Sequence, residues 1–432
     1  MLQDNTTQQL KTLETSYLKW RSFSLNDRIE VLKSIKENLL INKEKYAHCI
    51  TTDMNKPIKL ALAEVEKCAY LCDYYIENAG HFLENQEVKT GFSSSYITFR
   101  SLGVLLGVMP WNFPFWQVFR FVIPSLLTGN VIVLKHASNV PLSAQALDDI
   151  FNPATIDFPI YKNLPIKSSE VAQVIANPIV KAISLTGSEQ AGRSVAEIAG
   201  KHLKKCVLEL GGSNAFIVLK DADLNHAAEK AVSARMQNAG QSCIASKRFL
   251  IHEDVYSDFI NLFKQKLETL VTGDKYDPSV TFGEMAREDL AIELENQVQK
   301  SIAAGATIIT GGKRTEAFFE PTIVTNVTVD MPLFAEETFG PVAAVMPFKT
   351  LEEAIDLSNK SAYGLGVSIF TNKPDQLNDY LQQFDEGALF INEMVVSDPH
   401  LPFGGIKNSG YGRELSHFAL YEFANIQTVV VK

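Results

Sequence analysis

The chain has 432 residues, of which 46% are hydrophobic and 21% are charged. This balance is typical of a soluble globular protein, and the length exceeds one simple core, so we expect two or three domains. The formal net charge of −10 provides no basic surface for nucleic acid. No segment approaches the roughly 18 consecutive apolar residues of a membrane span, and the polar amino terminus lacks the pattern of a signal peptide.

The cysteines are odd in number and widely spread: Cys49, Cys68, Cys72, Cys206 and Cys243. Two of them, Cys68 and Cys72, lie four residues apart, as on one helix face. No second pair and no histidine stands nearby to complete a zinc site. We therefore expect no metal, and a reducing, cytoplasmic environment.

The first part of the chain is predicted to be helical over residues 9–82, because apolar residues recur at steps of three and four. Residues 83–101 change to alternating, extended segments around a turn-prone GFSS sequence, which predicts a hairpin. The tail, 427–432, is predicted to be a strand with no helix after it. It must therefore pair with a distant segment.

From residue 104 onwards, apolar strands alternate with helical stretches. Strands are predicted at 131–135, 180–185 and 206–210, with helices that begin at Leu142 and Ser188. Such alternation predicts a mostly parallel sheet with helices on both faces. The pattern continues far enough for a second α/β domain, with strands at 216–218, 248–251, 306–310, 343–347, 366–370 and 388–391.

Cys243, in the segment NAGQSC (238–243), has the surroundings of a nucleophile. Gly240 allows a close backbone approach, and Gln241 and Ser242 are too polar for an apolar core position. A nucleophilic cysteine needs access and a nearby proton acceptor. A buried structural cysteine is the alternative.

Glu209, in LELGG (208–212), is the candidate proton acceptor. Its neighbours Val207, Leu208 and Leu210 are apolar, and burial would raise the pKa of the carboxyl group towards the range of a general base. An exposed carboxylate at a strand end is the alternative.

Asn112 lies in PWNFP (110–114), where two prolines fix a turn that presents one side-chain amide. Together with the backbone N–H of Cys243, this amide would supply two donors for an oxyanion. An asparagine that satisfies its own turn is the alternative.

The segment Thr186-Gly187-Ser188 follows a predicted strand and begins a helix, so its N–H groups and the Ser188 hydroxyl would bind a pyrophosphate. The segment lacks the full G-x-G-x-x-G pattern, and a simple helix cap is the alternative. Lys135 ends another apolar strand, at the sheet edge where α/β proteins bind ligands. A lysine at a strand end can equally be solvated.

Together these segments resemble the aldehyde dehydrogenase family from about residue 20 to the end. The amino-acid sequences of residues 238–249 and 397–405 are similar to those of the short bacterial succinate-semialdehyde dehydrogenases. Seven motifs occur in the family's order, namely PWNFP (110–114), VLKHAS (133–138), LTGS (185–188), LELGG (208–212), GQSC (240–243), EETFGPV (336–342) and PFGGIKNSGYGRE (402–414).

The resemblance implies an α/β fold with three parts. These are a Rossmann-like cofactor domain (1–82 and 102–211), a catalytic α/β domain (212–408) and a β-arm (83–101 and 424–432). In the family the arm joins subunits, so the resemblance implies a homodimer or homotetramer.

The resemblance also implies a reaction, the oxidation of a small-molecule aldehyde to a carboxylate through a thioester. Cys243 would be the nucleophile, Glu209 the general base, Asn112 the oxyanion donor and Glu414 a proton relay. The cofactor, NAD or NADP, would contact Trp111, Lys135, Thr186, Gly187, Ser188, Glu337 and Phe339.

Ser138 bears on the choice of cofactor. Many NAD-preferring members carry a glutamate at this position, which would hold the 2′-hydroxyl of the ribose. Its replacement by serine removes a repulsion against a 2′-phosphate and slightly favours NADP.

The position of Arg120 in the sequence indicates a substrate with a negative charge. A helix over 115–123 would bury it among apolar neighbours, so its guanidinium needs an anion. We expect it on nearly the same helix face as Asn112, about 12 Å along the axis, with room for a four-carbon semialdehyde between them. The succinate-semialdehyde dehydrogenases carry a substrate-binding arginine at this position and a serine that Ser397 matches. A structural salt bridge from Arg120 to a nearby acid is the alternative.

Other functions are compatible with parts of this pattern. A thiol hydrolase would use Cys243 and Glu209 without a nucleotide, but it leaves Lys135 and Glu337 unexplained. A catalytically silent structural protein would have no reason to keep the Cys, Glu and Asn set. Within the enzyme class, the substrate could be another aldehyde, or coenzyme A could replace water as acceptor, although Glu209 favours water.

Overall fold

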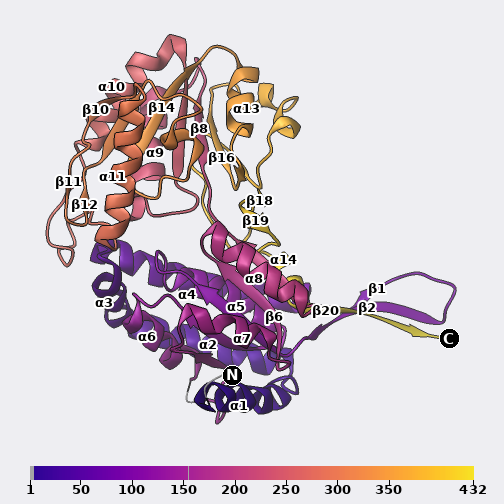
Figure 1. Ribbon diagram of the computed structural model, residues 1–432. Coiled ribbons are helices and arrows are strands. Elements are labelled where there is room, and N and C mark those ends of the chain that lie inside the picture. The colour runs from indigo at the N-terminus through magenta and orange to yellow at the C-terminus, as the bar shows by residue number, and fades with distance from the viewer. Residues whose placement is uncertain (1–3, 154) are drawn as a thin grey trace.

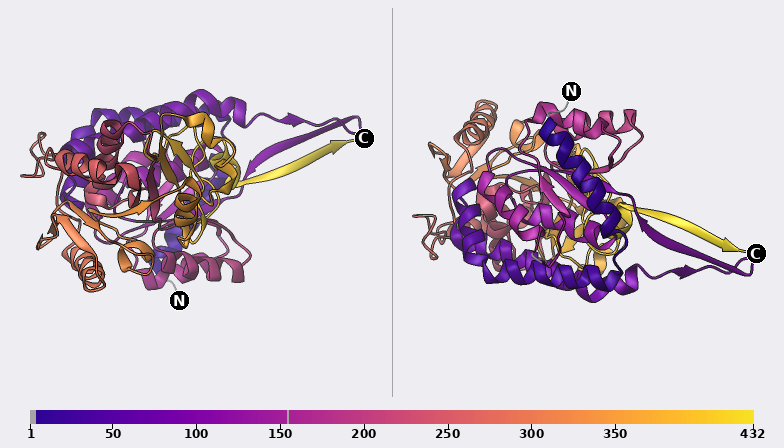
Figure 2. Two further views of the ribbon diagram at one scale, coloured as in Figure 1. Left: turned by 90° about the horizontal axis from the view of Figure 1, so that it is seen from above. Right: turned by 90° about the horizontal axis from the view of Figure 1, so that it is seen from below.

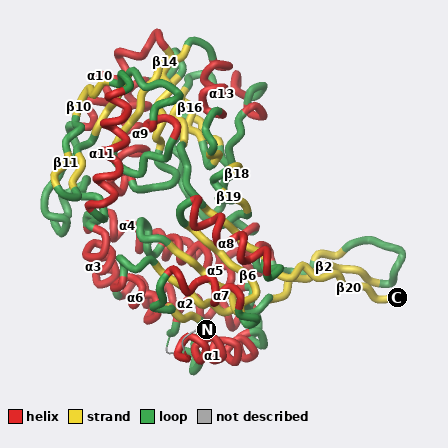
Figure 3. The backbone as a smooth tube through the Cα atoms, viewed as in Figure 1, coloured by secondary structure: helices red, strands yellow, loops and turns green. Residues whose placement is uncertain are grey.

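The computed structural model describes residues 4–153 and 155–432. Two α/β lobes lie one above the other in Figure 1, and a narrow arm made of β1, β2 and β20 projects from the body. The arm extends away from both lobes in the two further views as well (Figure 2). Colouring by secondary structure shows that each lobe has strands covered by helices (Figure 3). The predicted α/β class is confirmed.

Four helices open the chain, as predicted for 9–82: α1 (Asp4–Trp20), α2 (Leu25–Ile41), α3 (Lys43–Met54) and α4 (Ile58–Phe82). Ser24 begins α2 with a capping box, because its hydroxyl accepts from the Asp27 N–H while the Asp27 carboxylate accepts from the Ser24 N–H. The helices bury an apolar stripe, which includes Leu32 and Ile35, in the same apolar core as the first sheet. The amino-terminal helices therefore belong to the core of the lower lobe.

The first sheet has the order β19-β7-β6-β3-β4-β5. Five strands are parallel, and β19 is antiparallel to β7. The bounds are β3 (Val104–Met109), β4 (Val131–His136), β5 (Tyr161–Asn163), β6 (Val180–Thr186), β7 (Lys205–Glu209) and β19 (Gly410–Tyr411), with helices α5 (Trp116–Leu127), α6 (Pro141–Phe151), α7 (Val171–Ala176) and α8 (Glu189–Lys201). Because the strands are parallel, their carboxyl ends meet at one edge, which is where α/β sheets bind ligands.

The second sheet has the order β10-β13-β14-β9-β8-β16-β17, parallel except for β10. Its strands are β8 (Asn214–Val218), β9 (Ser246–His252), β10 (Thr307–Thr310), β13 (Thr322–Thr325), β14 (Val342–Phe348), β16 (Val367–Phe370) and β17 (Leu389–Ile391). The larger helices are α9 (Leu224–Met236), α10 (Tyr256–Leu267), α11 (Glu288–Ala303) and α13 (Leu351–Asn359). This sheet has a separate apolar core. The residue boundaries of the expected domains stay predictions.

The arm is a three-stranded antiparallel sheet of β1 (Gln86–Glu87), β2 (Ser94–Ser101) and β20 (Ala424–Val431). The register of β2 and β20 runs from Ser94 opposite Val431 to Ser101 opposite Ala424. The predicted hairpin and the predicted distant pairing of the tail are both confirmed. Among the described residues, no helix is long and apolar enough to cross a membrane.

Candidate active site

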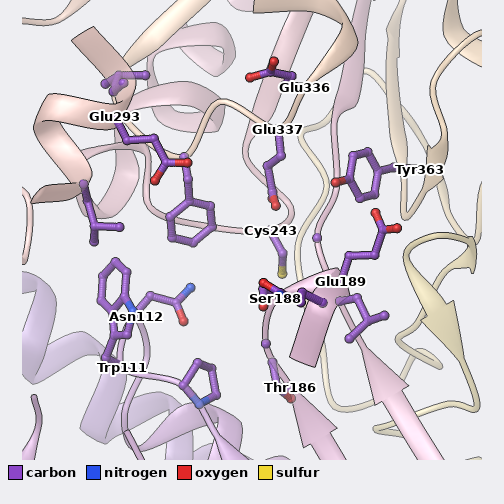
Figure 4. Close-up of a pocket in the computed structure, with 18 of the residues that line it drawn as sticks. Trp111, Asn112, Thr186, Ser188, Glu189, Cys243, Glu293, Glu336, Glu337 and Tyr363 are labelled. Atoms are coloured by element: carbon purple, nitrogen blue, oxygen red, sulfur yellow. The ribbon is translucent and has the colours of Figure 1, made fainter. Parts of the chain in front are cut away.

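Cys243 lies where two cavities meet. The larger cavity has a volume of about 440 Å³ and opens at the carboxyl edge of the first sheet, between the two lobes. The smaller cavity, of about 200 Å³, lies between α4, α5 and the loop that follows β17. Cys243 lines both, and Figure 4 shows its sulfur directed into the larger one, near Asn112 and Ser188. A group bound in either cavity can therefore reach the thiol.

An unusual backbone presents this cysteine. Asn238, Ala239 and Gly240 have φ angles of 54°, 52° and 73°, all in the left-handed region. A Cβ at Gly240 would lie 2.4 Å from the backbone of Gly340, so only glycine fits there. The buried Arg235 donates to the carbonyl groups of Gly240, Thr338 and Gly340 and so ties the cysteine loop to the segment that carries Glu337.

The Cys243 thiol is held mainly in its protonated form. Burial raises its pKa to about 11, although the positive charges of Arg120 and Lys247 oppose this rise. Lys247 also donates to the carbonyl oxygens of Ser242 (2.8 Å) and Cys243 (2.7 Å). The nucleophile thus needs a proton acceptor or a nearby charge before it can react.

Asn112 is buried and lines the larger cavity beside Cys243. Its Nδ2 donates one hydrogen to the Gln241 carbonyl (3.0 Å), and its Oδ1 accepts from Gln117 Nε2 (3.1 Å). An amide nitrogen has two hydrogens, so one remains for a bound group. The backbone N–H of Cys243 donates to no group among the described residues. The two expected oxyanion donors are thus both present beside the thiol.

Glu209 ends β7 and is buried, and burial raises the pKa of its carboxyl group well above the usual range, with a further rise from Glu414. Its side chain lines neither cavity. Instead the carboxyl group lies against Gly404, where a Cβ would come within 2.7 Å of Oε1. Its role as a base therefore requires the side chain to rotate towards Cys243, and it stays a prediction.

Glu414, the predicted proton relay, is buried and also has a raised pKa because of its burial. Its Oε2 lies 2.8 Å from Arg120 Nε in an ion pair, and its Oε1 accepts weakly from the Ser184 hydroxyl at 3.5 Å. The charge of Glu414 raises the pKa of Glu209, and two such neighbouring buried carboxyl groups can hold and exchange protons. The predicted role of Glu414 is compatible with this position.

The larger cavity has the donor set of a dinucleotide site. Ser188 caps α8 and leaves the N–H groups of the first helical turn at the cavity, while the buried Thr186 Oγ1 has no hydrogen-bond partner among the described residues. Trp111 and Phe339 form an edge-to-face pair with centroids 5.8 Å apart. The Glu337 carboxylate, which accepts from the Gly212 N–H at 3.0 Å, faces the cavity (Figure 4). These residues fit a nicotinamide nucleotide.

Lys135 and Ser138 lie outside the lining of the larger cavity. Lys135 is the last residue but one of β4 and is largely buried, and Ser138 follows in an exposed turn. Both lie on the carboxyl edge of the first sheet, so their predicted contact with the adenosine ribose stays a prediction.

Arg120 and Ser397 line the smaller cavity together. The expectation that Arg120 shares a helix face with Asn112 is wrong, because α5 begins at Trp116, after the prolines of the PWNFP turn. Arg120 forms an ion pair with Glu414, as expected if the arginine has a structural role. Its Nη2 is nevertheless buried and has no hydrogen-bond partner within the described part of the chain. The arginine therefore lines the cavity and combines an ion pair with a buried nitrogen that has no hydrogen-bond partner.

Comparison with known proteins identifies the family of this chain. The sequence profile of the aldehyde dehydrogenase family matches residues 3–429. The chain belongs to this family. It is 41% identical over 423 residues to the NADP(+) succinate-semialdehyde dehydrogenase of Deinococcus radiodurans, covering 97% of this chain and 89% of the relative. It is 43% identical over 429 residues to the NAD(P)+ succinate semialdehyde dehydrogenase Sad of Escherichia coli, covering 99% and 93%.

A solved structure gives the same result for the fold. The succinic semialdehyde dehydrogenase of Streptococcus pyogenes in complex with NADP+ superimposes with a TM-score of 0.96 at 37% identity, covering 100% of this chain and 96% of that protein. The predicted aldehyde dehydrogenase fold is thus confirmed.

Four residues of this aldehyde dehydrogenase site were not predicted from the sequence. Lys67 and Trp116 line the smaller cavity, and both donate to the Ser397 hydroxyl, at 2.9 and 3.0 Å. Lys56 and Glu64 form a buried ion pair beneath the PWNFP turn. Lys56 donates to the Asn112 carbonyl (3.1 Å), and the Glu64 carboxylate accepts from the first N–H groups of α5.

Proposed function

We propose that this protein oxidises succinate semialdehyde to succinate with NAD or NADP, through a thioester on Cys243. The observation that carries the proposal is the position of Cys243 between two cavities of different chemistry. One cavity has the donors that suit a nicotinamide nucleotide, and the other is lined by the cations Lys67 and Arg120 together with Cys243. The relatives are named succinate-semialdehyde dehydrogenases, which supports the same assignment.

The chain's own residues prepare the first step. The Cys243 thiolate attacks the aldehyde carbon, and the free hydrogen of the Asn112 amide and the Cys243 N–H stabilise the resulting oxyanion. A nicotinamide nucleotide, when bound, supplies the acceptor for the hydride. Trp111, Ser188 and Glu337 would hold that nucleotide in the larger cavity, which Cys243 also lines.

The second step releases the acid. Glu209, after rotating from its position against Gly404, takes a proton from water, and the resulting hydroxide attacks the thioester carbonyl. The bond between the carbonyl carbon and the sulfur then breaks, so that Cys243 leaves as the thiolate and the carboxylate product is released. Burial keeps the pKa of Glu209 high enough to accept that proton. Glu414 then provides a second buried carboxyl group to which the proton can pass.

The absence of a carboxylate at Ser138 supports use of NADP, and an NADP+ complex is among the similar structures. The projecting arm supports assembly into a homodimer or homotetramer. Within the described residues β20 pairs only with β2, so its other edge is free to pair with another subunit.

The test is a kinetic comparison of succinate semialdehyde with butanal, which has the same carbon chain without the carboxylate, using each cofactor in turn. We expect turnover of both aldehydes to disappear in Cys243→Ala, and kcat/KM in the wild type to be at least about tenfold higher for succinate semialdehyde, as expected for a charge-assisted contact. Equal efficiency for the two aldehydes would reject succinate semialdehyde as the substrate while leaving the dehydrogenase activity intact.

A further inference from the structure

The charged residues of the smaller cavity differ in whether their charge is already balanced. Lys56 is paired with Glu64, and Arg120 is paired with Glu414. Lys67, on α4, lines the same cavity and has no carboxylate within salt-bridge distance among the described residues. Lys67 therefore supplies the net positive charge of this cavity.

The contacts of Lys67 hold its ammonium group in place without neutralising it. Its Nζ donates to Ser397 Oγ at 2.9 Å and lies 4.3 Å from the centre of the Trp116 ring. A cation above an indole ring is attracted by the electron density of the ring but keeps its full charge. The remaining hydrogens of the ammonium group can therefore donate to a bound anion.

The same geometry fixes the direction of the Ser397 hydroxyl. Its oxygen accepts from both Lys67 Nζ and Trp116 Nε1, at 2.9 and 3.0 Å, which uses both of its lone pairs. Its own hydrogen finds no acceptor within the parts of the chain that the structure describes. The hydroxyl is therefore free to donate to a group bound in the cavity, which Arg120 also lines.

We propose that Lys67 and the Ser397 hydroxyl that it orients bind the terminal carboxylate of the substrate, so that Lys67 determines the preference for an aldehyde with a distal negative charge. This inference rests on the proposed function and deepens it. Arg120 contributes a donor, but its charge is shared with Glu414. The three donors face a cavity of about 200 Å³, which suits a short chain with one terminal anion.

The test replaces Lys67 with Met, which keeps the length and apolar volume of the side chain, and with Arg, which keeps the charge. For Lys67→Met we expect kcat/KM for succinate semialdehyde to fall at least about tenfold, mainly through KM, because a charge-assisted contact is lost. The value for butanal should stay within about twofold, since an uncharged substrate makes no such contact. Lys67→Arg should recover most of the loss.

Lys59→Met is the matched control, because Lys59 is exposed on the same helix and lines neither cavity. It should leave both substrates unchanged. Thermal melting of each variant checks the fold, and loss of an unpaired, partly buried charge should not lower the Tm of Lys67→Met.

A pH profile adds a readout that a structural role would not change. Burial and the nearby Arg120 lower the pKa of Lys67 to about 8, while Glu64 and Cys68 on α4 and Asp398 in the loop after β17 oppose this shift. Lys67 is charged below that pH and neutral above it. The ratio of kcat/KM for succinate semialdehyde to that for butanal should therefore fall above about pH 8 in the wild type, and stay flat in Lys67→Met.

The outcomes separate this inference from the proposed function. If the wild type does not prefer succinate semialdehyde over butanal, the proposed substrate is wrong. If the wild type has the preference and Lys67→Met keeps it, or if that variant loses both substrates alike, Lys67 is not the residue that determines it and only this inference fails.

Discussion

The Cys243 thiol combines access to two cavities with a high pKa. Burial raises that pKa to about 11, so the reactive thiolate is a small fraction of the enzyme at neutral pH. We expect alkylation of Cys243 by iodoacetamide, in the absence of cofactor, to accelerate about tenfold per pH unit between pH 7 and 9. Mass spectrometry of the labelled peptide distinguishes Cys243 from the partly exposed Cys49 and Cys206.

The positive charge of Lys247 provides the control for this measurement. Lys247 lowers the pKa of Cys243 while it is charged, but burial lowers the pKa of Lys247 itself to about 8. Lys247→Met should therefore slow labelling at pH 7 and have a smaller effect at pH 9. A labelling rate that is already constant between pH 7 and 9 would show that the thiolate is stabilised far more than its burial allows.

Glu209 allows the two chemical steps to be separated. Burial raises the pKa of Glu209 and so disfavours the charged form of its carboxyl group. Glu209→Gln, a neutral replacement of the same shape, should therefore leave the Tm unchanged. The amide cannot take a proton from water, so a burst of one reduced cofactor per active site should persist while steady turnover falls by about 10²-fold or more. Rapid-mixing absorbance measurements check both phases, and loss of the burst would assign Glu209 to activation of the thiol instead.

At the scale of elements, the loop before Cys243 depends on one glycine. Gly240 has a φ of 73°, and a Cβ there would lie 2.4 Å from the backbone of Gly340. We expect Gly240→Ala to destabilise the protein by about 1–3 kcal/mol or more, because the backbone must shift, and to lower turnover through displacement of Cys243. Thermal melting and steady-state kinetics measure the two effects.

Gly200→Ala is the matched control for this substitution. Gly200 lies in α8, where an added Cβ meets nothing within 4 Å. It should leave activity unchanged and stabilise the helix by about 0.5–1 kcal/mol. If Gly240→Ala behaved like this control, the strained loop would not be what positions the cysteine.

The elements were largely predictable from the sequence because each leaves a local pattern. The strands β4 and β6 are apolar runs, and α8 begins with Ser188 as its cap. Several short antiparallel elements were missed. One is β19, which has only two residues and pairs with β7 through Gly410 opposite Glu209. Such a pairing joins segments about two hundred residues apart and has no periodicity to reveal it.

The site was less predictable, because side-chain direction is decided by tertiary contacts. Asn112 was expected on the helix of Arg120, whereas the PWNFP turn separates it from α5. The orientation of Glu209 towards Gly404 depends on a loop from the far end of the chain. Lys67 resembles any charged residue of an amphipathic helix, and only the position of Ser397 shows that it faces a cavity.

The arm of β1, β2 and β20 exposes apolar residues that no other described part of the same chain covers. Both β2 and β20 have eight residues, and they extend beyond the two lobes (Figure 1). Ile426, Val430 and Val431 are 57%, 45% and 52% exposed. A long, apolar edge strand favours aggregation unless another strand or surface covers it. The proposed assembly of subunits through the arm removes that problem.

Substitutions on the arm test this assembly. Ile426 and Val430 lie on one face of β20, since side chains alternate along a strand. We expect the double variant Ile426→Lys, Val430→Lys to change the mass measured by light scattering from that of a dimer or tetramer to that of a monomer, because two charges would have to be buried at the interface. Leu18→Lys, which replaces a residue 59% exposed on α1, controls for the loss of any exposed apolar side chain. A wild-type enzyme that is monomeric, or a double variant that keeps its assembly, would show that the arm does not join the subunits.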